Sequence, residues 1–153
     1  MKKQISLWIV LIAANFFIFS SCDKNDDPPP PQKTKTELIT QGSWKFSTAT
    51  ANGSDASSYL QACQKDNFYI FLVGGTGTVN EGPTTCNAGD PQTTPFTWAF
   101  ASNETILNVN APFFSNTSNS FTLISISETQ LVVKTLYTPP IGPSIEVIVT
   151  FVH

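Results

Sequence analysis

Arginine is missing from this 153-residue chain, and charged residues of all kinds make up only 12% of it. From Ser43 onward acidic residues outnumber lysines and no basic cluster is present. The lysines are Lys45, Lys65 and Lys134, and the acids are Asp55, Asp66, Glu81, Asp90, Glu104, Glu128 and Glu146. Nucleic-acid-binding proteins neutralise phosphates with clustered lysine and arginine. The composition therefore excludes nucleic acid as a partner.

Histidine is almost absent too, since His153, the last residue, is the only one. A hydrolytic triad needs a base beside its nucleophile, and zinc sites draw on histidine and cysteine, so this composition supports neither. The acids are scattered, mostly near turns, and do not indicate a glycosidase pair. Asp66-Asn67 and Asn87 to Asp90 could supply oxygen ligands to calcium, although Asx turns explain them more simply. We expect no enzyme, no metal and no cofactor.

The N-terminal segment has the pattern of an export signal, predicted over residues 1–21. Lys2 and Lys3 precede an apolar run from Ile5 to Phe19, and two serines follow before Cys22. An uncleaved membrane helix is the alternative. The run is short for a bilayer span of about 20 residues, and acidic residues follow it directly.

The segment Phe19-Ser20-Ser21-Cys22 resembles the lipobox of bacterial lipoproteins, with phenylalanine where leucine is preferred. The resemblance implies that Cys22 carries lipid, including a palmitate-type acyl chain, and that the membrane is a partner; two chains suffice for stable anchoring. The following Lys24-Asn25-Asp26-Asp27 is similar to the acidic export signal of Bacteroidota lipoproteins. That implies an outer-membrane, lipid-anchored protein displayed at the cell surface. A plain solvated linker, with no information on orientation, is the alternative.

Residues 22–40 read as the lipidated N-terminus and a flexible linker. Four consecutive prolines, Pro28 to Pro31, favour polyproline II, and the segment has too little apolar surface to fold alone. An SH3-type ligand is the alternative interpretation of these prolines, and an exported protein has little use for one. The folded domain is predicted over residues 41–153.

The domain reads as about eight short strands with turn residues between them, which predicts an all-β fold. In the first strand Trp44, Phe46 and Thr48 share a face, and Asn67 to Val73 is apolar on both faces, typical of a strand covered on both sides. Gly74, Gly75 and Gly77 are expected to turn the chain back. Two later strands alternate clearly, with Phe96, Trp98 and Phe100 on one face and, near the end, Ile145, Val147, Val149 and Phe151. Sequential hairpins favour an up-and-down barrel over a sandwich.

Several of these segments together resemble the lipocalin-like domains of Bacteroidota lipoproteins. They are Leu38 to Thr40, Gly42 to Phe46, Cys63 with Asp66-Asn67, Phe71, Cys86 and Trp98 to Phe100. Gly42-x-Trp44 is similar to the G-x-W of lipocalins, whose tryptophan packs at the closed end of the barrel. The chain lacks the arginine that stacks on that tryptophan, and the T-D-Y segment. The resemblance implies a lipocalin-like β-barrel and leaves the ligand open.

The remaining cysteines, Cys63 and Cys86, are predicted to form a disulfide, because an exported protein in an oxidising compartment normally pairs them. The bond would staple the strand between them and its hairpin return to the flanking segments, adding about 3.5 kcal/mol by chain entropy. A redox or metal site is the alternative. It lacks a C-x-x-C spacing and a suitable histidine.

Two functions fit this reading. One is a non-enzymatic binding module for a small apolar ligand, with Trp44, Phe46, Phe96, Trp98 and Phe100 as candidate interior, ligand-contacting residues. The other is a structural or interaction lipoprotein, with a barrel filled by its own side chains and a protein or glycan partner at the cell surface. Five aromatic residues on two strands could fill a small barrel, so the sequence leaves both open.

Overall fold

The computed structural model describes residues 31–110 and 113–153. The predicted signal peptide, the predicted lipidation site Cys22 and the first part of the predicted linker lie outside the described residues. The described elements are α1 (Lys35–Ile39), β1 (Ser43–Ala51), β2 (Ser54–Asp55), the 3-10 turn η1 (Ser57–Tyr59), α2 (Ala62–Lys65), β3 (Phe68–Leu72), β4 (Thr76–Asn80), β5 (Thr93–Ala101), β6 (Ile106–Val109), β7 (Ser120–Ile126), β8 (Gln130–Tyr137) and β9 (Ile145–Val152).

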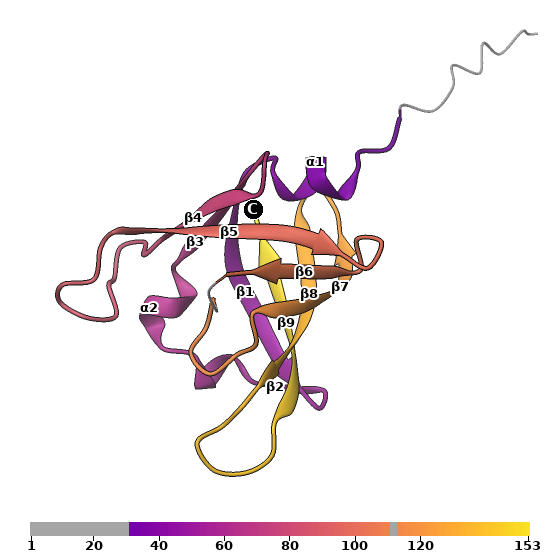
Figure 1. Ribbon diagram of the computed structural model, residues 1–153. Helices are drawn as coiled ribbons and strands as arrows, with labels where there is room; N and C mark the ends of the chain where they lie inside the picture. Colours follow the sequence, from indigo (N-terminus) through magenta and orange to yellow (C-terminus); the bar gives the residue numbers. More distant parts are fainter. Residues whose placement is uncertain (1–30, 111–112) are drawn as a thin grey trace, which may run out of the picture. The chain divides into compact units, whose positions relative to one another are not determined.

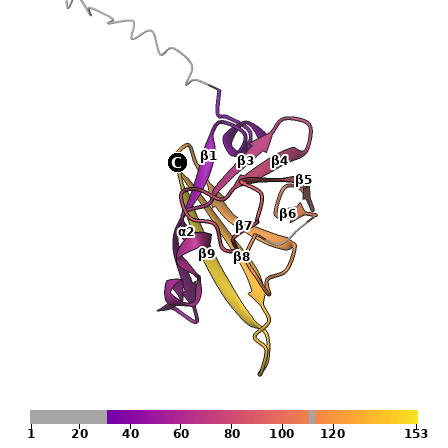
Figure 2. The ribbon, with the colours of Figure 1, turned by 90° about the vertical axis from the view of Figure 1, so that its left-hand side faces the viewer.

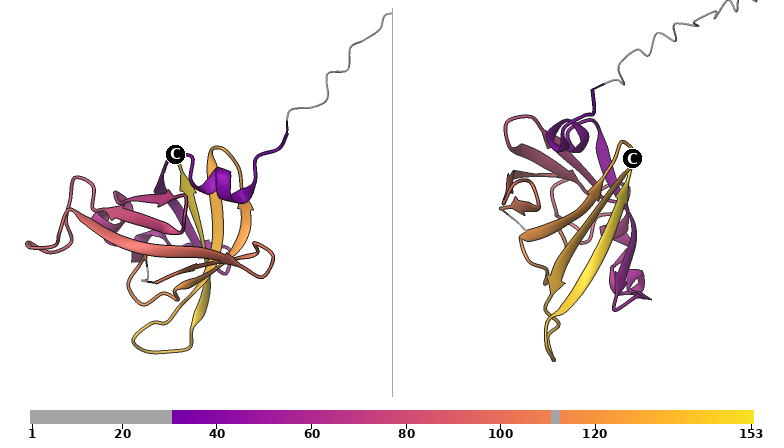
Figure 3. Two further views of the ribbon diagram at one scale, coloured as in Figure 1. Left: turned by 45° about the horizontal axis from the view of Figure 1, so that its top comes forward. Right: turned by 90° about the vertical axis from the view of Figure 1, so that its right-hand side faces the viewer.

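The strands form a closed, antiparallel, up-and-down barrel (Figure 1). β1 pairs with β3, every later strand pairs with its neighbour in sequence, and the pairing of β1 with β9 closes the sheet. Figure 3 shows the sheet curling round until these two strands lie side by side. The two-residue β2 only extends a hairpin from the end of β1. The predicted fold class, an eight-stranded lipocalin-like barrel with one disulfide, is confirmed.

One end of the barrel is covered by α1, which lies within the predicted flexible linker of residues 22–40. A capping box begins the helix: the Glu37 backbone N–H donates to the Thr34 hydroxyl, and the Thr34 backbone N–H donates to the Glu37 carboxylate. These bonds from Thr34 lower the pKa of Glu37. Ile39 is completely buried. The compact unit accordingly begins at Gln32, because a capped helix with one apolar anchor extends the domain into the predicted linker.

Polar contacts tie α1 and its flanks to two hairpin turns at this closed end. The Lys35 ammonium donates to the Glu104 carbonyl in the β5–β6 turn at 2.9 Å. Lys33 forms an ion pair of 2.7 Å with Glu128 in the β7–β8 turn, whose carbonyl also accepts from the Gln41 amide. The β8–β9 connection and β2 lie toward the other end, which we call the open end (Figures 1 and 2).

Alternation along β5 and β9 is as predicted. Phe96 and Trp98 are buried with Phe100 partly so, and Val149 and Phe151 are buried while Glu146 and Ile148 face outward. The prediction for Thr48 is wrong. A bulge between Phe46 and Thr48 shifts the register of β1 against β9, so Thr48 is exposed and Ala49 takes the inward position.

Two expectations about the Asn67 to Val73 strand and its turn are also wrong. Only the inward face of β3 is fully buried, through Tyr69 and Phe71: Phe68 and Ile70 on the outer face are half-buried, and Leu72 and Val73 at its end are exposed, since a single-walled barrel has only one buried face. Gly77 lies inside β4 rather than in the turn. A Cβ there would overlap the Phe96 ring and the Ile70 carbonyl, so glycine makes room for an aromatic core residue.

Candidate functional site

The barrel interior differs between its two ends. The closed end is filled by aromatic rings: Phe71 meets Phe96 edge-on at 5.2 Å, and Phe113 stacks on Phe121 at 5.5 Å between ring centroids. The free volume among these side chains is about 10 Å³. That is barely room for one water molecule. This end is therefore packed protein core.

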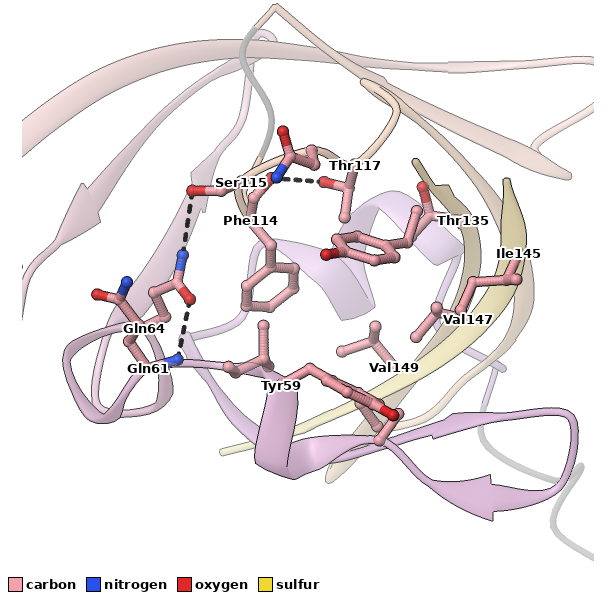
Figure 4. Close-up of a pocket in the computed structure, with 15 residues that line it drawn as sticks. Tyr59, Gln61, Gln64, Phe114, Ser115, Thr117, Thr135, Ile145, Val147 and Val149 are labelled. Atoms are coloured by element: carbon pink, nitrogen blue, oxygen red, sulfur yellow. Dashed lines mark hydrogen bonds between the residues drawn. The ribbon is translucent and has the colours of Figure 1, made fainter. Parts of the chain in front are cut away.

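The open end contains a pocket of about 200 Å³ (Figure 4). Its walls come from the inward faces of β1, β8 and β9, from the segment between β2 and β3, and from the β6–β7 connection. The lining residues are Ala49, Ala56, Tyr59, Leu60, Gln61, Gln64, Phe114, Ser115, Asn116, Thr117, Thr135, Tyr137, Ile145, Val147 and Val149. An engineered apolar cavity of about 150 Å³ binds benzene, so this pocket suits a ligand of on the order of ten non-hydrogen atoms.

Phe114 separates the pocket from the filled end. Its ring projects into the pocket from the β6–β7 connection (Figure 4). On the other side it stacks on Phe151 and meets Tyr69 edge-on, both at 6.1 Å between centroids. The side chain is 3% exposed. It is thus the floor of the pocket and the last ring of the aromatic core.

The wall contributed by α2 is held by hydrogen bonds and by the disulfide. The Gln64 amide donates to the Ser115 hydroxyl at 3.4 Å across to the β6–β7 connection, and its carbonyl accepts from the Gln61 backbone at 3.1 Å (Figure 4). Between these glutamines, Cys63 is bonded to Cys86 with Cα atoms 5.2 Å apart. The predicted disulfide is confirmed, and it fixes α2 to the loop after β4.

A buried asparagine reinforces this attachment. The Asn67 side-chain amide, oriented to satisfy both partners, donates to the Cys63 carbonyl at 2.8 Å and to the Glu81 carbonyl at 2.9 Å. A buried amide is stable only when its hydrogen bonds are made. Asn67 therefore ties the end of α2 to the end of β4, close to the disulfide.

His153, the last residue and predicted to be unsuited to catalysis, packs against the closed end of the barrel. Its ring lies on Trp44 with 3.8 Å between centroids. Nδ1 donates to the Ser43 carbonyl at 2.9 Å, and the Gln41 amide nitrogen lies 3.1 Å from Nε2. The Trp44 indole N–H donates to the Ile39 carbonyl at 2.8 Å. In this chain, which has no arginine, it is therefore the His153 ring that stacks on the tryptophan.

The five aromatic residues predicted to contact a ligand point inward, and none of them lines the pocket. Trp44 is fully buried, Phe46, Phe96 and Trp98 are at most 8% exposed, and Phe100 packs against this core. Trp98 donates to the carbonyls of Leu72 and Thr76. Their contact with a ligand stays a prediction. The pocket residues were missed because most lie in loops or are small aliphatic residues whose spacing does not distinguish core from cavity.

In the acidic loops considered for calcium, one carboxylate oxygen of Asp66 and one of Asp90 accept internal hydrogen bonds, while Oδ1 of Asp66 is buried without a hydrogen-bond partner among the described residues. The Thr84 backbone donates to the Asp66 carboxylate at 3.1 Å, and Asn87 donates to Asp90 through its backbone and its amide. No group of three or more histidine, cysteine or acidic residues that could hold a metal occurs in residues 31–110 and 113–153. Over the same residues, no helix is long and apolar enough to cross a bilayer.

Solved structures with a similar arrangement match this chain at low sequence identity. A deswapped triple mutant of bovine odorant binding protein matches at 13% identity with a TM-score of 0.44, over 73% of this chain and 72% of that one. The bovine protein in complex with a selenium-containing odorant matches at 13% identity with a TM-score of 0.44, over 81% of this chain and 75% of that one. The siderocalin Ex-FABP, described as having dual ligand specificities, matches at 10% identity with a TM-score of 0.42, over 75% of this chain and 73% of that one.

A search of curated proteins found no match. Among family models, that of the lipocalin-like domain matches residues 40–133, from the residue before Gln41 to the middle of β8. The matched range contains Trp44, both disulfide cysteines and the first seven of the eight barrel strands, in whole or in part. It covers more than half of the chain. The chain belongs to the lipocalin-like domain family.

Proposed function

We propose that the protein is a non-enzymatic binding module that holds a small, largely apolar ligand in the open-end pocket. The observation that carries the proposal is the pocket itself: about 200 Å³ of space beside a barrel end in which the free volume is about 10 Å³. Barrels of this size either fill their interior with side chains or hold one small ligand. The alternative is a barrel that is filled throughout by its own side chains and acts only through its surface. In this interior only the closed end is filled in that way.

The walls and floor favour apolar binding because aliphatic and aromatic side chains line the deep part of the pocket. Val149 on β9, Ala49 on β1 and Phe114 are at most 3% exposed. Apolar ligand surface moved from water onto these groups gains about 25 cal/mol per Å². Polar side chains, including Gln61, Gln64 and Ser115, complete the lining. This combination of an apolar body and a few polar groups is typical of small-molecule sites.

The test uses octan-1-ol as a probe and isothermal titration calorimetry on the purified full chain. Val149→Phe places a ring into the pocket and should abolish octanol binding. Ile148→Phe is the matched control, because the neighbouring side chain on β9 is 38% exposed and faces outward, and binding should be unchanged. Octanol binding that survives Val149→Phe, or no binding by the parent chain, would refute the proposal.

We also propose that Cys22 anchors the protein to the outer membrane, as in lipoproteins of the Bacteroidota type. The lipobox-like sequence around Cys22 supports this assignment, and a disulfide between the other cysteines suits an oxidising compartment. Cys22→Ala should abolish incorporation of radiolabelled palmitate and move the protein to the soluble fraction. The double variant Cys63→Ala/Cys86→Ala is the control and should keep its label. Unchanged labelling of Cys22→Ala would refute the anchor.

The run Lys24-Asn25-Asp26-Asp27 supports display on the outer face of that membrane. Replacing these four residues with alanine should protect the protein from proteinase K added to intact cells, while the parent chain is digested. Equal digestion of both would show that the run is a plain linker.

A further inference from the structure

The pocket is notable for the charge that it lacks. All fifteen lining residues are uncharged: none is lysine, histidine, aspartate or glutamate. We infer that the pocket selects uncharged ligands that carry one hydrogen-bonding group, such as an alcohol or a carbonyl compound, and rejects carboxylates of the same length. The inference rests on the proposed binding function and specifies its ligand class.

The described lysines other than Lys65, and the histidine, make contacts outside the pocket. At the closed end Lys35 donates to the Glu104 carbonyl, Lys33 pairs with Glu128, and His153 lies on Trp44. On the outer surface Lys45 lies 5.5 Å from the Phe68 ring centroid, and Lys134 pairs with Glu146 at 2.7 Å.

Lys65 follows the pocket residue Gln64 on α2 but is not part of the lining. The pKa of Asp55 is lowered by hydrogen bonds from Ser57 and, as the smallest contribution, by the charge of Lys65, although the two side chains form no ion pair. The lining itself thus offers no positive charge that could pair with an anion. A carboxylate placed in the pocket would lose water without gaining a cation, and burying an unpaired charge is strongly unfavourable.

A neutral polar group, in contrast, has partners on β8. Thr135 and Tyr137 lie two positions apart on this strand and both line the pocket. The Thr135 side chain is 4% exposed, and its hydroxyl makes only a long bond of 3.4 Å to the Ser120 carbonyl, which leaves its oxygen able to accept. The Tyr137 hydroxyl makes no hydrogen bond to another described residue. These two hydroxyls are therefore the groups that we assign to the ligand's polar atom.

The central test compares octan-1-ol with octanoate, which share the chain and differ in charge, by calorimetry on the full chain at pH 7. Octanol should bind at least tenfold more tightly. The difference should narrow as the pH falls below the acid's own pKa of about 4 to 5, because the ligand then becomes neutral. Equal or tighter binding of octanoate at pH 7 would overturn the inference and leave the binding function standing. Failure of both ligands to bind would overturn both.

A second test supplies the missing charge. Gln64→Lys should raise the ratio of octanoate affinity to octanol affinity at least fivefold, since it places a cation in the pocket wall. Gln130→Lys adds the same net charge at an exposed position on β8 that is not part of the pocket, and should change neither ligand. An equal gain in octanoate affinity in both variants would show that the overall charge of the protein, and not the pocket, controls the selection between octanol and octanoate.

The hydroxyl assignment has its own variants. Thr135→Val and Tyr137→Phe keep shape and remove one hydroxyl each, and together they should weaken octanol threefold or more while leaving n-octane binding unchanged. Octanol binding that persists at full strength in the double variant would remove these hydroxyls from the site.

Discussion

The closed and open ends of this barrel share strands β1, β8 and β9 and differ in the size of the side chains that these strands direct inward. Going from the closed end to the open end, β1 carries Trp44 and Phe46 and then Ala49, while β9 carries Phe151 and then Val149. The large residues fill one half and the small ones leave the pocket in the other. The size of the inward side chains along each strand therefore determines which end of this barrel has room for a ligand.

The ends also differ in how they are covered. The closed end is sealed by α1, by the bond from Trp44 to the Ile39 carbonyl, and by the His153 ring. The open end is crossed by α2, whose contact with the opposite loop is the 3.4 Å bond from Gln64 to Ser115. Regions with few buried apolar contacts open at lower free energy than packed cores. Ligand entry is therefore expected at the open end while the closed end stays folded.

The largest contrast should come from truncating one aromatic residue at each end. Phe151 is 2% exposed and meets Tyr69 at 5.3 Å, so Phe151→Ala should lower the free energy of unfolding by about 3 to 5 kcal/mol. Tyr137→Ala, which truncates a half-buried ring beside existing space, should cost about 1 kcal/mol. Urea denaturation measures both. Equal losses would mean that the two ends are packed alike.

The disulfide stabilises the open-end wall, so its removal should affect both stability and binding. Cys63→Ser/Cys86→Ser should lower the free energy of unfolding by about 3.5 kcal/mol through the lost loop constraint. It should also weaken octanol binding, because α2 and the residue that caps it contribute two lining residues, Gln64 and Gln61. Reductant should reproduce the loss in the parent chain and have no effect on the variant. Unchanged octanol affinity would show that hydrogen bonds alone hold the wall.

Alkaline pH should act on the closed end through Tyr69. Burial raises the pKa of its hydroxyl well above the ordinary value, and the hydroxyl donates to the Phe113 carbonyl. Above about pH 10 the unfolded chain loses this proton while the folded chain keeps it, so stability falls by up to about 1.4 kcal/mol per pH unit. The contribution of the protonated Tyr69 hydroxyl to the free energy of unfolding is complete below pH 10 and is lost as the pH rises toward the pKa of Tyr69 in the folded chain.

Tyr69→Phe should flatten this alkaline loss, because the remaining tyrosines, Tyr59 and Tyr137, are common to both proteins and cancel in the comparison. Chemical denaturation at several pH values between 8 and 11 would measure the two slopes. Parallel slopes would mean that Tyr69 ionises as readily in the folded chain as in the unfolded one.

The aromatic core of the closed end and the disulfide beside the open end could both be predicted from the sequence, because strand alternation is a local signal and cysteine pairing needs only the number of cysteines. The inward face of Phe96, Trp98 and Phe100 follows from period two, and the Cys63–Cys86 bond follows from pairing the cysteines that remain once Cys22 is assigned to lipid. The bulge after Phe46 was not predictable in this way. It depends on how β1 pairs with β9, about a hundred residues later in the chain.

The pocket could not be predicted because it arises where separate segments meet. Phe114 reaches the interior from a connection with no strand pattern, and Gln64 reaches the wall through a four-residue helix. His153 was underestimated for the same reason, since only the closure of the barrel brings it to Trp44. Volume is a property of three-dimensional packing, and a pattern of inward residues does not show whether they meet.

The most sensitive comparison of the two ends uses one substitution at two places. Val133 on β8 and Val149 on β9 are 1% and 2% exposed, and Val133 lies among the packed closed-end side chains while Val149 lines the pocket. Val133→Ala leaves a new cavity, whereas Val149→Ala only enlarges an existing one. Because cavity creation adds to the lost transfer free energy, Val133→Ala should cost about 1 kcal/mol more in urea denaturation. Val149→Ala should also bind decan-1-ol, the longer homologue of octan-1-ol, more tightly than the parent chain does. Val133→Ala should show no such gain in decan-1-ol affinity.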